Sequence, residues 1–200
     1  MEWITRIIEY LMSLFNKQNV GTVIKPTIPD TPITQPTENR MQNDFVETMI
    51  GNIIKREGGY SMDKDDPGGE THWGISKRAY PSINIKTLTT DQATNIYYKD
   101  YYLASRCDQL PKNLQEIFLD MTVLHGKSGA TKVLQKAING VVSPDIKVDG
   151  VLGNITASLA PRVEPNRLRA YRVKDLAEKV VSNPNLEKYW YGWYTRATSV

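Results

Sequence analysis

Apolar residues recur at helical spacing in two separate segments near the start of the chain. In residues 1–17 they form one broad stripe: Trp3, Ile4, Ile7, Ile8, Leu11, Met12, Leu14 and Phe15. After Asn43 or Asp44, either of which can cap a helix, they form a second stripe: Phe45, Val46, Met49, Ile50, Ile53 and Ile54. Residues 18–40, between the stripes, are rich in Pro and Thr and read as an extended, semi-stiff linker.

The second stripe ends on a carboxylate. Glu57 lies four residues after Ile53 and three after Ile54, so it continues the apolar face, and Gly58-Gly59 should end the helix there. Burial of a carboxyl group raises its pKa, which is what a general acid acting on a glycosidic oxygen requires. The spacing leaves a second interpretation open, in which Glu57 pairs with Lys55, Arg56 or a distant base and only supports packing.

The remaining start and stop signals in the sequence are mostly those of helices, and they predict a mainly α single domain from residue 41 onwards. Residues 89–92 form a capping box that opens a helix carrying Ala93, Ile96, Tyr97 and Tyr101. Asn113 and Ser128 can each begin a helix, Asn154 opens a short helix that Pro161 ends, and Pro165 suits a further first turn. The only reasonable strand candidate is the run 71–76, which we expect to form a short β-hairpin beside a cleft.

Four ordered blocks of sequence resemble one enzyme family. They are E-G-G-Y at 57–60 with D-D-P-G-G-E-T-x-W-G-I-S at 65–76; the run 119–123 with Gly126 and 134–137; V-D-G-V-L-G-N-I-T at 148–156; and Y-G-W-Y-T-R at 191–196. Together they resemble glycoside hydrolase family 108, the N-acetylmuramidases of phage endolysins and some bacterial protein-export clusters. The resemblance covers about residues 42–197, and departs from the family at Leu124-His125, where the family usually has Asn before the glycine.

This resemblance implies a lysozyme-like fold that cleaves peptidoglycan between N-acetylmuramic acid and N-acetylglucosamine, with Glu57 as the catalytic acid. It also implies a division of the domain into a catalytic part, 41–133, and a peptidoglycan-binding-like part, 134–200. Asp66 stands at the Glu-x8-Asp spacing of phage lysozymes, with Thr71 soon after, so Asp66 is a candidate second catalytic residue. The alternative is that residues 66–69 simply form a turn in which Asp66 bonds its own backbone.

Substrate-binding candidates surround the same loop. We expect Tyr60, Glu70, Thr71 and Trp73 to contact the glycan, although Tyr60 and Trp73 could equally pack in the core. Three further aromatic residues are weaker candidates for sugar platforms: Tyr98, Trp190 and Trp193. The helical spacing of Trp190, Trp193 and Tyr194 favours core packing for that group.

Composition narrows the chemistry further. The 200-residue chain has 40% hydrophobic residues and a net charge of +3, which suits anionic cell-wall partners but is too weak to indicate nucleic-acid binding. The two histidines lie in unrelated segments, so no metal site or cofactor is expected, and Cys107 has no histidine near it in sequence to support a cysteine peptidase. The basic residues around 162–174, Arg172 among them, are expected to form a solvated helix face.

Residues 1–17 are too short and too charged to span a bilayer, and they lack the features of a cleavable signal peptide. We therefore expect action on the periplasmic cell wall after export by a holin, a secretion system or a virion. A helix this short needs a partner, which could be another protein, a membrane surface or the domain itself. The alternative to an enzyme is a non-catalytic peptidoglycan-binding or secretion-accessory module on the same fold.

Overall fold

The apolar stripe that ends on Glu57 forms a helix that lies against the core. In the computed structural model, which describes residues 44–62 and 69–200, helix α2 (Asp44–Glu57) buries five residues of this stripe: Val46, Met49, Ile50, Ile53 and Ile54. Gly58 follows with φ 83°, a left-handed conformation that ends the helix. The predicted amphipathic helix 1–17, the linker 18–40 and Asp66 all lie outside the described residues.

A two-residue hairpin follows the helix. Strands β1 (Thr71–His72) and β2 (Ile75–Ser76) pair antiparallel, with Thr71 opposite Ser76 and His72 opposite Ile75. Trp73 and Gly74 between them have φ values of 53° and 75°, and positive φ at both positions is what a type I′ turn requires. Ser61 pairs with Thr71 through two backbone hydrogen bonds of 2.8 and 2.9 Å. The expected short hairpin is therefore confirmed.

Helical segments make up most of the rest. After η1 (Ile85–Thr87), helix α3 (Thr90–Ile96) begins at the predicted capping box, in which Thr89 and Gln92 exchange side-chain and backbone hydrogen bonds of 3.0 and 3.3 Å. The predicted single helix through Tyr101 instead continues as a π-helix, η2 (Tyr97–Leu103), and η3 (Cys107–Gln109) follows. Such wider turns are frequent near functional sites.

Helix α4 (Lys112–Asn139) runs through the centre of the fold and bends sharply at Gly126, where φ 70° and ψ 164° are not helical. It begins at Lys112, just before the predicted cap at Asn113. The two helices that the sequence predicts, one from Asn113 and one from Ser128, are the two halves of α4 on either side of the bend. The first half is buried on nearly every side, which is why its sequence shows little helical periodicity.

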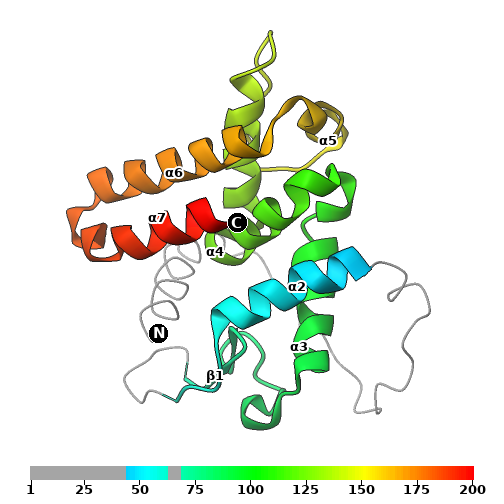
Figure 1. Cartoon of the computed structure of the whole chain (residues 1–200), viewed down its shortest axis with the longest axis vertical. Helices are drawn as coiled ribbons and strands as arrows, with labels where there is room; N and C mark the ends of the chain where they lie inside the picture. Colours follow the sequence, from blue (N-terminus) through cyan, green and yellow to red (C-terminus); the bar gives the residue numbers. More distant parts are fainter. Residues whose placement is uncertain (1–43, 63–68) are drawn as a thin grey trace.

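The C-terminal third wraps around α4. Helix α5 (Asn154–Leu159) and η4 (Ala160–Arg162) precede α6 (Pro165–Ser182), which starts at the predicted proline, and η5 (Pro184–Tyr189) leads into α7 (Trp190–Ser199). Figure 1 shows α6 and α7 lying antiparallel, side by side. A small apolar cluster joins them and contains Trp193, with Trp190 packed against it, as core packing predicts, while Tyr194 is half exposed. The architecture is a mainly α single domain with a short β-hairpin, as expected.

Candidate active site

Glu57 is buried at the end of α2. Its side chain is 2% exposed, and its Oε1 accepts a hydrogen bond of 2.7 Å from Nη2 of Arg196 on α7. Both features expected of Glu57 from the sequence are therefore present: its side chain continues the buried apolar stripe, and it also pairs with a distant base, Arg196. Burial raises the pKa of Glu57 above its usual value, and this effect outweighs the opposing influence of Arg196.

Arg196 bridges two carboxyl groups. Its Nε and Nη2 also donate to Asp120 on α4 at 3.0 to 3.2 Å, so that one guanidinium group joins α2, α4 and α7. Asp120 accepts a further hydrogen bond from Nη2 of Arg172 on α6, and both of these side chains are fully buried. The expectation that Arg172 belongs to a solvated face is thus wrong, since it is an internal partner of Asp120.

The hairpin turn lies against Glu57. A Cβ atom on Gly74 would stand 2.9 Å from Glu57 Cγ and would collide with the hydroxyl of Tyr97. That hydroxyl donates a hydrogen bond of 3.0 Å to the backbone oxygen of Trp73. Glycine at 74 is therefore needed both for its positive φ and for the close approach of the turn to the acid.

The predicted substrate-binding residues lie on this hairpin and in the segment that joins it to α2. The Tyr60 hydroxyl donates to Glu70 at 3.1 Å, and the Tyr60 ring meets His72 edge-on. The Trp73 ring stacks on His72 with centroids 4.6 Å apart. Thr71 is 5% exposed, and its hydroxyl has no hydrogen-bond partner among the described residues.

Sequence reasoning did not assign chemistry to Asp120, Arg196 or Tyr97. Two of them stood inside blocks that carried the family resemblance: Asp120 in the run 119–123 and Arg196 at the end of Y-G-W-Y-T-R. Tyr97 was assigned only to a helix face. A charged residue inside an otherwise apolar helical run, such as Asp120, is the signal that could have found the cluster.

The rival chemistries find little support in the described part of the chain. Cys107 is buried, its thiol donates to the Gln115 backbone oxygen, and burial raises the pKa of that thiol well above its usual value. Such a thiol is a poor nucleophile. Residues 44–62 and 69–200 contain no cluster of three or more His, Cys, Asp or Glu that could hold a metal ion.

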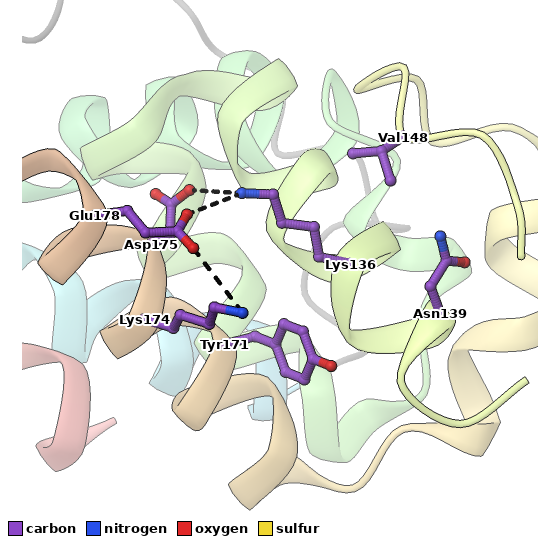
Figure 2. Close-up of a pocket in the computed structure, with 7 residues that line it drawn as sticks. All are labelled: Lys136, Asn139, Val148, Tyr171, Lys174, Asp175 and Glu178. Carbon is purple, nitrogen blue, oxygen red and sulfur yellow. Dashed lines mark hydrogen bonds and ion pairs between the residues drawn. The ribbon is translucent and has the colours of Figure 1, made fainter. Parts of the chain in front are cut away.

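A separate hollow of about 240 Å³ lies between α4 and α6. Figure 2 shows its charged residues facing one another, and Lys136 pairs with Asp175 at 3.5 Å and with Glu178 at 3.4 Å. Lys174 also reaches Glu178, at 3.9 Å. The hollow shares no lining residue with the Glu57 site, and these charges neutralise one another.

A mainly helical domain with a buried acid at a helix end, beside a short hairpin, has the arrangement expected for a lysozyme-like glycoside hydrolase. The match with the family model for glycosyl hydrolase 108 covers residues 50–126, which include Glu57, the hairpin and Asp120. This match bears out the resemblance to a family of N-acetylmuramidases over these residues and supports a glycoside hydrolase that acts on peptidoglycan.

The fold comparison agrees. The structure of SagA from Brucella abortus is similar over 77% of this chain and 90% of that chain, with 26% sequence identity and a TM-score of 0.63. The comparison with curated proteins gives no match. Arg196 lies beyond the segment that the family model matches, so its pairing with Glu57 is evident only in the folded chain.

Proposed function

We propose that Glu57 is the general acid that protonates the glycosidic oxygen between N-acetylmuramic acid and N-acetylglucosamine. The observation that carries this proposal is the burial of its carboxyl group at the end of α2, which raises its pKa despite the contact with Arg196. A carboxyl group that keeps its proton towards neutral pH can deliver it to a leaving sugar oxygen.

The other assignments follow from position around this acid. Asp66 would act as the second carboxylate, by orienting a water molecule or stabilising positive charge on the sugar ring. Tyr60, Glu70 and Trp73, on or beside the hairpin, would contact the glycan. The hydroxyl of Thr71, which has no hydrogen-bond partner among the described residues, would help to hold a water or sugar hydroxyl. Asp120 is a poor candidate for the second catalytic group because it is fully buried between arginines.

The biological setting that fits best is phage lysis, with the enzyme reaching the periplasmic wall through a holin. A virion-borne or secretion-associated muramidase would use the same catalytic residues. The three settings differ in how the enzyme is exported, so the export route is what an experiment in cells should test. None of the described helices is long and apolar enough to span a membrane.

The deciding experiment is mass spectrometry of purified peptidoglycan digested by the parent protein and by Glu57→Gln. The parent should release fragments with new reducing ends on muramic acid, and Glu57→Gln should keep its fold but lose about 10² to 10⁴ in rate. Glu116→Gln is the matched control, because Glu116 is a partly exposed carboxylate that binds Arg56 and does not touch Glu57.

Two results would overturn the proposal. One is a folded Glu57→Gln protein that digests peptidoglycan at the parental rate. The other is a product mixture in which stem peptides are cut and the glycan strands remain whole.

A further inference from the structure

Asp120 lies at the centre of a buried cluster that joins four helices. Its carboxylate accepts hydrogen bonds from Arg196 of α7 and from Arg172 of α6. In addition, Nη1 of Arg56 on α2 lies 3.7 Å from its Oδ1. Glu57 belongs to the same cluster through Arg196 alone. Asp120 is therefore one guanidinium group away from the proposed acid.

When Glu57 is protonated, the buried part of the cluster contains two guanidinium groups, of Arg172 and Arg196, and one negative charge, on Asp120. The third guanidinium group, of Arg56, and its partner Glu116 at 3.1 Å are 28% and 33% exposed. Four guanidinium nitrogens are buried without a hydrogen-bond partner among the described residues: Arg56 Nη1, Arg172 Nε, Arg172 Nη1 and Arg196 Nη1. An uncompensated arginine next to Glu57 would favour its ionised form, which is the wrong form for a general acid.

We propose that Asp120 is a positioning residue that orients Arg196 towards Glu57 and offsets its charge, so that Glu57 is held in place and still retains its proton. The inference rests on the proposed role of Glu57 as the acid. Three hydrogen bonds from Nε and Nη2 of Arg196 to Asp120 fix the plane of the guanidinium group, and in this orientation Nη2 also donates to Glu57.

The other groups facing Glu57 do not replace Asp120. Arg56 on α2 and Arg196 on α7 are cations. On η2, burial raises the pKa of Tyr97 well above its usual value and the pKa of Tyr101 to about 12, so both remain neutral at working pH. Asp120 is also buried, but Arg196 and Arg172 lower its pKa to about 2, which keeps it negatively charged.

The test compares the pH dependence of peptidoglycan hydrolysis with a direct NMR titration of the Glu57 side-chain carboxyl carbon. In Asp120→Asn, the negative charge is lost, the pKa of Glu57 falls, and the alkaline limb of the activity profile should move about one unit lower. In Arg196→Gln, the positive charge is lost, and the same limb should move higher. A role limited to packing would not produce shifts of opposite sign.

Asp175→Asn is the matched control. Asp175 also joins buried or half-buried basic groups, His125 and Lys179, but these lie outside the Glu57 cluster. This variant should lose stability without moving the alkaline limb. If Asp120→Asn does not fold, Asp120→Asn combined with Arg172→Gln removes the buried pair together and should still lower the pKa of Glu57.

Two outcomes would overturn the inference: an unchanged Glu57 titration in the folded Asp120 variants, or shifts of the same sign in Asp120→Asn and Arg196→Gln. Because the NMR titration does not depend on turnover, it separates this inference from the proposed function. Full activity of Glu57→Gln would remove the proposed acid, whereas an inactive Glu57→Gln with no titration shift in Asp120→Asn would remove only the role of Asp120.

Discussion

Single residues decide how close the hairpin comes to the proposed acid. Gly74 has φ 75° and lies so close to Glu57 and Tyr97 that a Cβ atom would not fit between them. Trp73 also has positive φ, which is uncommon for a bulky side chain and is held here by the turn and by the hydrogen bond from Tyr97. This strain next to Glu57 supports a functional role for the turn.

Gly74→Ala should therefore impair activity more than stability. Positive φ costs an alanine about 1–2 kcal/mol, and the new methyl group must displace Glu57 or Tyr97. A displacement of about 1 Å at a reacting group is worth on the order of 10² in rate. The measurement is peptidoglycan hydrolysis alongside thermal unfolding.

Gly51→Ala is the control, because a Cβ atom there meets nothing within 4 Å and the residue lies inside helix α2. It should retain full activity and gain a little stability from the helix preference of alanine. Equal activity in Gly74→Ala and Gly51→Ala would contradict the close packing of the turn on the acid.

At the scale of elements, α4 and α6 are joined by a buried histidine. His125 lies just before the bend of α4, and its Nδ1 lies 3.0 Å from Nζ of Lys179 and 3.5 Å from Asp175 on α6. Burial, together with Lys179 and Arg172, lowers the pKa of His125 from 6.5 to about 4 in spite of Asp175. The folded protein therefore holds this imidazole neutral.

This histidine should make the fold sensitive to acid. The unfolded chain binds a proton at His125 near pH 6.5 but the folded chain only near pH 4, so stability is full above pH 6.5 and falls as the pH drops. The loss should reach about 3 kcal/mol by pH 4. Urea unfolding at pH 7 and pH 4 measures it.

His125→Gln should reduce the difference in unfolding free energy between the two pH values, because the amide carries no titrating proton. His72→Gln serves as the control, since His72 lies partly exposed on the hairpin, and it should keep the parental difference. An unchanged pH dependence in His125→Gln would show that His125 does not carry the effect.

For the whole molecule, the charged side chains of the Glu57 cluster all belong to residues 44–62 and 69–200, which the structure describes. Deletion of residues 1–40 should therefore leave hydrolysis of purified peptidoglycan intact and change only localisation or assembly. A protein partner for the stripe 1–17 remains the favoured prediction, because its polar face is not the basic one that anionic lipid requires.

Two assays check this deletion: release of fragments from purified walls, and fractionation of cells that express the full and shortened chains. An unfolded or inactive truncated protein would mean that residues 1–40 complete the core. Identical fractionation of both chains would remove the role of the stripe in localisation.

The sequence by itself determined the elements whose signals are local. The apolar stripe of α2, its end at Gly58, the capping box at Thr89 and the proline that begins α6 follow from the chemistry of neighbouring residues, and each is present. Glu57 could be singled out for the same reason, because a carboxylate on an apolar helix face is visible at a spacing of three or four residues.

Only the tertiary structure decided which charges meet. Glu57, Asp120, Arg172 and Arg196 come from four helices spread over some 140 positions, and no local pattern specifies that they share one buried cluster. The sequence placed Arg172 on a solvated face because its neighbours are charged, whereas packing of α6 on α4 turned it inwards to Asp120. Pairing across the core depends on how helices cross, and this is a property of the whole fold.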